Sequence, residues 1–136
     1  MAGSYRILEA HNLAYFRFHG TVTTPQCVAM LSAYAADPLA NPEQAHFSDL
    51  SEVTQIKADH QTMLQMILQI AQISRYERST ALSAVYVPNS GFHEIMGVYR
   101  RLCDEFLSVR VQVFREETAA LTYVGHPDTR LSTLLA

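Results

Sequence analysis

The sequence predicts a single α/β domain in which one mixed five-stranded sheet packs against about four helices. Three observations support this fold class. Short extended segments alternate along the chain with segments of helical length, which is typical of α/β proteins. The first two extended segments, residues 5–10 and 13–20, are separated only by His11 and Asn12, so we expect an antiparallel hairpin. Helices of crossover length separate the later strands, and this makes those strands parallel.

Residues with known effects on the backbone delimit each element. Thr23 or Thr24 caps the first helix, Pro25 stands in its first turn, and two prolines within 37–43 prevent its continuation. The fourth strand is apolar enough to lie inside the sheet. The remaining elements are predicted as a third strand over 45–50, a long helix over 58–76, a fourth strand over 79–87, a helix over 92–106, a fifth strand over 109–114, and a closing helix over 115–124 that ends at Gly125.

Composition indicates one folded domain, spanning residues 1–136. The chain is 49% hydrophobic and 17% charged, values that argue against disorder. Its formal net charge is −3, and it has no block of lysines or arginines. Because phosphate neutralisation requires clustered cations, we expect no nucleic-acid partner.

Cysteine usage and hydropathy indicate a cytoplasmic protein. Cys27 and Cys103 form neither a CxxC pair nor a disulfide framework, so reduced thiols are expected. The most apolar run, MLQMILQIAQI at residues 63–73, is interrupted by glutamines and is too short to cross a bilayer. We therefore expect no integral membrane segment.

No pattern of catalytic or metal-binding residues stands out. The sequence contains no GxSxG elbow, no phosphate-binding loop and no GxGxxG fingerprint, and its six histidines lack zinc-site spacing. His46 and Asp49 lie three apart in a predicted strand, so their side chains face opposite sides of the sheet. We expect a protein without enzymatic activity, cofactor or metal.

Three stretches resemble the STAS family (sulfate transporter and anti-sigma-factor antagonist), and more closely its bacterial SpoIIAA-like group. They are FHGTVTTPQCVAML, DPLANPEQAHFSDLSEV and VQVFREETAALTYVG. The first is similar to an opening strand, glycine, threonine and helix; the second to an Asp-Pro loop and a strand ending in Asp-Leu-Ser; the third to a last strand and final helix. The resemblance covers about residues 5–125 and leaves 126–136 as a C-terminal extension.

The resemblance implies a non-enzymatic regulatory module that binds a protein partner or forms a homodimer. An alternative is a carrier of a small apolar or acyl ligand, because Sec14-type lipid-binding domains share this fold. In anti-sigma-factor antagonists a serine at the start of the second long helix is phosphorylated. The matching stretch here, IKADHQ, contains no serine, so that role does not carry over. Asp59 is interpreted as an ordinary first-turn acid, with a fixed mimic of phosphate as the less favoured reading.

Polar residues are expected at the carboxyl edge of the sheet, where α/β proteins gather ligands. Asp49 is placed at the end of the third strand, with Ser51 close behind, and free amides after the fourth strand could receive an anion. Local capping and turn formation are the favoured explanation of the same residues. The candidate edge for a ligand or partner comprises Asp49, Ser51, Asp59, Asn89, Ser90, Gly91 and Arg115.

The long helix is apolar around most of its circumference. A narrow stripe of glutamines is polar, and the remaining surface exceeds what one face needs for packing on a sheet. A neighbouring helix, a second copy of the chain or a ligand pocket could cover the surplus. An apolar cavity would favour the carrier, and a flat apolar patch would favour the interaction module. The candidate interface or pocket residues are Met63, Met66, Ile67 and Ile70.

Overall fold

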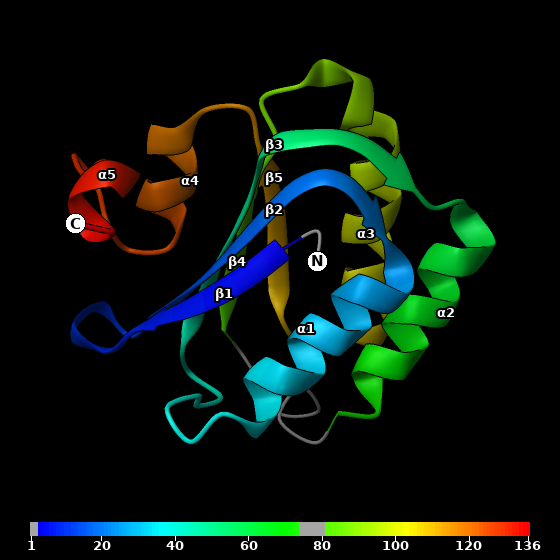
Figure 1. The fold of residues 1–136 in the computed structure, drawn as a ribbon, viewed down its shortest axis with the longest axis horizontal. Coiled ribbons are helices and arrows are strands. Elements are labelled where there is room, and N and C mark those ends of the chain that lie inside the picture. The colour runs from blue at the N-terminus through cyan, green and yellow to red at the C-terminus, as the bar shows by residue number, and fades with distance from the viewer. Residues whose placement is uncertain (1–2, 74–80) are drawn as a thin grey trace.

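The computed structural model describes residues 3–73 and 81–136, which form one five-stranded sheet (Figure 1). The strands follow one another across the sheet in chain order. β1 pairs with β2 in antiparallel fashion and the other three pairings are parallel, so the predicted mixed sheet is confirmed. The fourth strand lies inside the sheet, as expected. The strands are β1 (Gly3–Leu8), β2 (Leu13–Thr23), β3 (Ala45–Lys57), β4 (Leu82–Tyr86) and β5 (Arg110–Phe114).

Helices cover both faces of the sheet. Three of them lie on one face because the crossovers from β2 to β5 all step in the same direction and are all right-handed (Figure 1). The helices after β5 cover the opposite face. The first face carries α1 (Thr24–Ala36), α2 (His60–Ala71) and α3 (His93–Phe106), and the second carries α4 (Glu117–Tyr123) and α5 (Leu131–Leu134). Two short 3-10 helices are η1 (Glu9–His11) and η2 (Ser90–Phe92).

Several predicted boundaries are confirmed. Asn12 closes the β1–β2 connection with a φ of 47°, in the left-handed region that asparagine tolerates. Thr23 is the N-cap of α1, and the Gln26 side chain accepts a hydrogen bond from its backbone amide at 3.2 Å. Gly125 follows α4 with a φ of 92°, and its amide donates to the Thr122 carbonyl at 3.1 Å.

The predicted end of the third strand is wrong. β3 continues past Leu50 to Lys57, because β2 also continues and the two strands stay paired as far as Thr23 opposite Lys57. Asp49 therefore lies within β3 and not at its carboxyl end, although it is the last residue paired with β4. The segment after Leu50 was not predicted as strand because buried and exposed residues do not alternate strictly along it.

In the second half of the chain the predicted elements are present but differ at their ends, and η2 and α5 were not predicted. Within the described residues the long helix begins at His60, two residues late, and ends at Ala71. The last residues predicted for it, 74–76, and the first predicted for the fourth strand, 79–80, lie outside the described residues. The closing helix begins at Glu117, two residues later than expected.

Two hydrophobic clusters hold the layers together. The larger lies between the sheet and α1–α3, and the smaller lies between the sheet and α4–α5. α2 contacts both α1 and α3, which cover part of the surplus apolar surface of that helix and leave Leu68 exposed. The C-terminal extension supplies Leu131 and Leu134 to the smaller cluster, and Arg6 donates to the Leu135 carbonyl at 2.8 Å.

Candidate functional site

An apolar cavity of about 90 Å³ lies between the sheet and the layer formed by α1, α2 and α3. The strands form its floor and the helices its opposite wall. All three helices and four of the five strands contribute, so the cavity is a property of the whole fold. Its lining consists of Phe16, Phe18, Val22, Thr23, Thr24, Cys27, Leu31, His46, Ser48, Leu50, Ile56, Ala58, Met63, Met66, Ile70, Ser83, Val85, Met96, Tyr99, Leu107, Val109 and Val111.

The β2–β3 ribbon closes one end of the cavity. Beyond the end of β4 the two strands continue together and curve toward the helical face (Figure 1). Two register shifts accompany the bend, on either side of Gly20, whose φ of 64° suits a residue without a Cβ. The curved ribbon places Val22 and Ile56 against the cavity. A longer third strand therefore creates part of the site.

Three polar side chains stand together on the cavity floor. His46 and Ser48 lie two apart on β3 and so share one face, and Ser83 on β4 is the register partner of His46. His46 is buried and packs edge-on against the rings of Phe16 and Tyr34. Burial lowers the pKa of His46 to about 4, so its imidazole is neutral at pH 7.

The two thiols are protonated at neutral pH. Burial raises the pKa of Cys27, which lines the cavity, to about 11. Burial also raises the pKa of Cys103 to about 12. Because the thiolate is the nucleophilic form, neither cysteine has the chemistry of an activated nucleophile.

Three of the four predicted pocket residues line this cavity. They are Met63, Met66 and Ile70, all buried on the inner side of α2. Ile67 is fully buried in the larger cluster but does not belong to the lining. His46 and the serines were not predicted. The sequence feature that could have identified them is the presence of polar residues in two buried strands, on the side that faces the helical layer. That side can be assigned only once the strand register is known.

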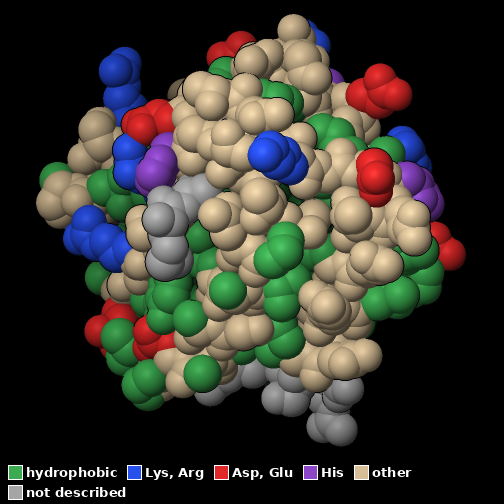
Figure 2. Space-filling model, turned by 45° about the vertical axis from the view of Figure 1, so that its right-hand side comes forward, with side chains coloured by type: hydrophobic (Ala, Val, Ile, Leu, Met, Phe, Trp, Pro, Cys, Tyr) green, Lys and Arg blue, Asp and Glu red, His purple; other side chains and the backbone are tan. Residues whose placement is uncertain are grey.

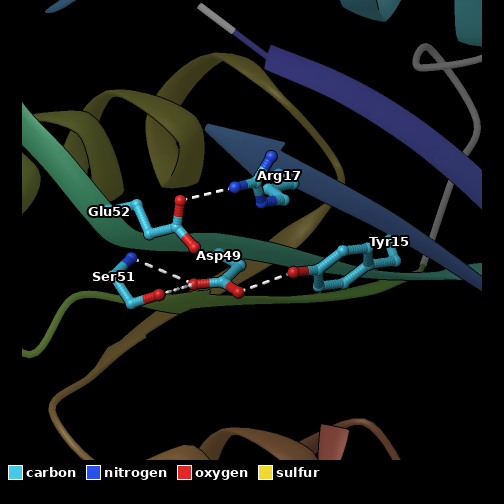
Figure 3. A network of polar contacts seen from close by, with 5 residues as sticks. All are labelled: Tyr15, Arg17, Asp49, Ser51 and Glu52. Carbon is cyan, nitrogen blue, oxygen red and sulfur yellow. Dashed lines mark hydrogen bonds and ion pairs between the residues drawn. The ribbon is translucent and has the colours of Figure 1, made fainter. Parts of the chain in front are cut away.

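A second group of polar residues lies on the opposite face of the sheet (Figure 3). Asp49 accepts a hydrogen bond from the Tyr15 hydroxyl at 2.6 Å. Its other oxygen accepts from the Ser51 hydroxyl at 2.6 Å and from the Ser51 amide at 3.0 Å. Beside them Arg17 pairs with Glu52 across the same two strands. We call these five residues the Asp49 network.

The hydrogen bonds and ion pair of the Asp49 network link β2 to β3. Both carboxylate oxygens of Asp49 already accept hydrogen bonds, which satisfies a buried charge. Burial, followed by the hydrogen bond to Asp49 and its negative charge, raises the pKa of Tyr15, so this hydroxyl keeps its proton. The sequence identified Asp49 and Ser51 but missed Tyr15, Arg17 and Glu52, which the β2–β3 register brings beside them.

None of the hydrogen bonds or ion pairs of the described residues joins the other residues of the predicted edge to Asp49. Asn89 caps η2 by accepting a hydrogen bond from the Gly91 amide at 2.9 Å, and Ser90 is exposed between them. Arg115 is exposed in the turn after β5. Asp59 lies beyond a further eight residues of β3, a strand length of about 26 Å. The structure thus brings together Asp49 and Ser51 and separates them from Asp59.

No protein-family model and no curated protein matches the chain. Among solved structures, it is similar to the crystal structure of an uncharacterised protein from the DUF3478 family of Shewanella loihica PV-4, described as having a SpoIIAA-like fold. The similarity has a TM-score of 0.52 and 15% sequence identity, and it covers 82% of this chain and 83% of the other. The chain has a SpoIIAA-like fold.

In this SpoIIAA-like fold, Asp59 is the N-cap of α2. Its carboxylate accepts a hydrogen bond from the Thr62 amide at 2.8 Å, and the Thr62 hydroxyl accepts one from the Asp59 amide at 3.0 Å. The hydrogen bond from the Thr62 backbone is the main cause that lowers the pKa of the fully exposed Asp59. Capping therefore accounts for an acid at this position.

Residues 3–73 and 81–136 of the SpoIIAA-like fold contain neither a membrane-spanning helix nor a metal-binding cluster. No helix there is long and apolar enough to span a bilayer. Nor do the same residues hold any cluster of three or more His, Cys, Asp or Glu side chains arranged to bind a metal ion.

Proposed function

We propose that the protein is a non-enzymatic binding protein for a small, predominantly apolar molecule held between the sheet and α1–α3. The apolar cavity is the observation that supports this proposal. Clefts with apolar walls and a few convergent polar groups are the usual form of small-molecule sites. Here the walls are aliphatic, aromatic and methionine side chains, and the convergent polar groups are His46, Ser48 and Ser83.

The cavity volume limits the size of the ligand. At about 90 Å³ it is smaller than an engineered cavity of roughly 150 Å³ that accepts benzene. A body of about four or five carbons matches this space, and an acyl chain of lipid length does not fit inside it. The unbranched side chains of Met63, Met66 and Met96 provide a wall that adapts to small differences in ligand shape.

The alternative function is an interaction module that binds a regulatory protein or a second copy of the chain. A continuous apolar patch would favour it. Among the described residues the large exposed hydrophobic side chains are Leu39 in the turn after α1, Leu68 on α2 and Phe106 at the end of α3. Figure 2 shows the side of the molecule that carries α1 and α2, where hydrophobic side chains lie in separate groups among polar ones. The distribution of apolar surface thus favours the cavity.

The absence of enzymatic activity is part of the proposal. Cys27 and Cys103 stay protonated, His46 is buried and neutral, and the Asp49 carboxylate is fully engaged in hydrogen bonds. A screen against ester, phosphoester and thioester substrates should give turnover no greater than buffer. Turnover that a single histidine or cysteine substitution abolishes would overturn this part.

Native mass spectrometry of the purified protein, together with gas chromatography of an extract, tests the proposed function. The expected result is a small apolar compound that co-purifies with the protein. Cys27→Leu adds side-chain volume inside the cavity and should abolish its recovery. Ala36→Leu makes a comparable change at an exposed site on the same helix and should leave recovery unchanged.

The same measurement separates the two candidate functions. A dimer or a co-purified protein, with no small molecule in the extract, would favour the interaction module. Equal recovery of a compound from wild type and from Cys27→Leu would place that compound outside the cavity and contradict the proposal.

A further inference from the structure

The cavity has no charged side chain in its described lining. Its 22 lining residues include no Asp, Glu, Lys or Arg. The polar groups among them are hydroxyls, one thiol and one imidazole. The hydroxyls and the thiol are neutral at pH 7 by their ordinary chemistry, and the imidazole of His46 is neutral because it is buried. An ion transferred into such a site would lose its hydration without gaining an opposite charge, which is strongly unfavourable.

Three of the polar groups of the cavity lie together on β3 and β4, whereas those of Thr23, Thr24, Cys27 and Tyr99 belong to β2, α1 and α3. His46 and Ser48 on β3 and Ser83 on β4 form a small polar patch on an otherwise apolar floor. Ser83 is only 4% exposed, so its hydroxyl points away from bulk water. A serine hydroxyl both donates and accepts hydrogen bonds, so it can serve a ligand hydroxyl or a ligand carbonyl equally well.

We propose that the cavity selects uncharged molecules of about four or five carbons that carry one hydroxyl or carbonyl group, and rejects ions of the same size. Ser48 and Ser83 hold the polar group of the ligand, and its hydrocarbon body lies against Met63 and Met96. This inference rests on the proposed function and adds the chemical class of the ligand.

Methyl NMR of protein labelled with ¹³C at its methionine methyl groups tests this inference. Met63 and Met96 line only the cavity, Met66 also borders a surface groove between α1 and α2, and Met30 is buried but lines neither. The probes are 1-butanol, 1-chlorobutane, butylammonium and butyrate at pH 7. The two neutral probes should shift the Met63 and Met96 signals and leave Met30 unchanged. The two ions should bind at least about tenfold more weakly.

Serine variants test the polar anchor. Ser83→Ala should weaken the binding of 1-butanol about three- to tenfold, the range of one neutral hydrogen bond, and leave that of 1-chlorobutane unchanged. Ser48→Ala provides an independent second variant. Ser32→Ala removes an exposed hydroxyl from α1 and is the matched control, with no effect expected on either probe.

Each outcome bears on a distinct claim. If the ions bind as tightly as 1-butanol, the selection of neutral ligands is overturned while small-molecule binding survives. If 1-butanol binds both serine variants as tightly as wild type, the assigned polar anchor is wrong. If no probe shifts Met63 or Met96, or only Met66 responds, the cavity is not the binding site and the proposed function fails together with this inference.

Discussion

Acidification should destabilise the protein through His46. Burial lowers the pKa of His46 from its ordinary 6.5 to about 4, so the folded state binds the proton less tightly than the unfolded state. The stabilisation by neutral His46 is complete above pH 6.5 and is lost progressively as the pH falls toward 4. A difference of 2.5 pKa units, at 1.36 kcal/mol each, makes this loss about 3 kcal/mol by pH 4.

Urea unfolding at pH 7, 6, 5 and 4 measures this contribution directly. Carboxylates also titrate in this range, so the informative quantity is the difference between wild type and His46→Gln, which cannot take up a proton. Between pH 7 and pH 4 wild type should lose about 3 kcal/mol more unfolding free energy than the variant. His19→Gln changes an exposed histidine on β2 and should behave as wild type. An equally steep pH dependence in His46→Gln would refute the reasoning.

Three further substitutions test other parts of the structure. Tyr15→Phe removes a hydrogen bond from the buried Asp49 carboxylate and should lower the unfolding free energy by about 1–3 kcal/mol in urea titrations; no change would show that the Asp49 network contributes nothing to stability. Ile67→Ala should cost about 2–5 kcal/mol, whereas Leu68→Ala, at a side chain 42% exposed, should cost less than about 0.5 kcal/mol; similar losses would contradict the assigned faces of α2. Asp59→Asn keeps a capping side chain and should lower the melting temperature by only a few degrees. The oligomeric state measured by light scattering should not change, and a change in it would instead indicate that Asp59 mimics a phosphate.

The sequence predicted the fold because its signals are local. His11 and Asn12 mark the hairpin, Thr23 and Pro25 mark the start of α1, and Gly125 marks the end of α4. Each acts through the backbone of its own neighbours, so its effect can be judged without knowledge of the tertiary structure.

The extent of β3 could not be predicted in the same way. Its last seven residues are strand because β2 runs beside them, and that pairing joins segments more than thirty residues apart, as the Tyr15–Asp49 hydrogen bond also does. Tertiary context overrides local propensity more readily in strands than in helices. The end assigned at Leu50 was wrong for this reason.

In the candidate site, too, the features that depend on local sequence were predicted and those that depend on tertiary structure were not. The apolar circumference of the long helix predicted a covered surface and named Met63, Met66 and Ile70, which line the cavity. The cavity itself depends on how the curved β2–β3 ribbon and three helices pack over the sheet. Its presence and volume therefore could not be predicted from a pattern of residues. The contact between Asp49 and Ser51 joins residues two apart and could be predicted from the sequence. The grouping of His46, Ser48 and Ser83 on the cavity floor depends on the strand register and could not.

A crystal structure under xenon pressure tests most directly whether the protein has a ligand-accessible apolar cavity. Xenon occupies dry apolar cavities without requiring any specific polar contact. We expect a xenon atom between the sheet and α1–α3, in contact with Met66 and Val85. We expect no xenon at this place in crystals of Cys27→Leu treated in the same way. Xenon found only on the molecular surface of the wild-type protein, with nothing between the sheet and these helices, would contradict it.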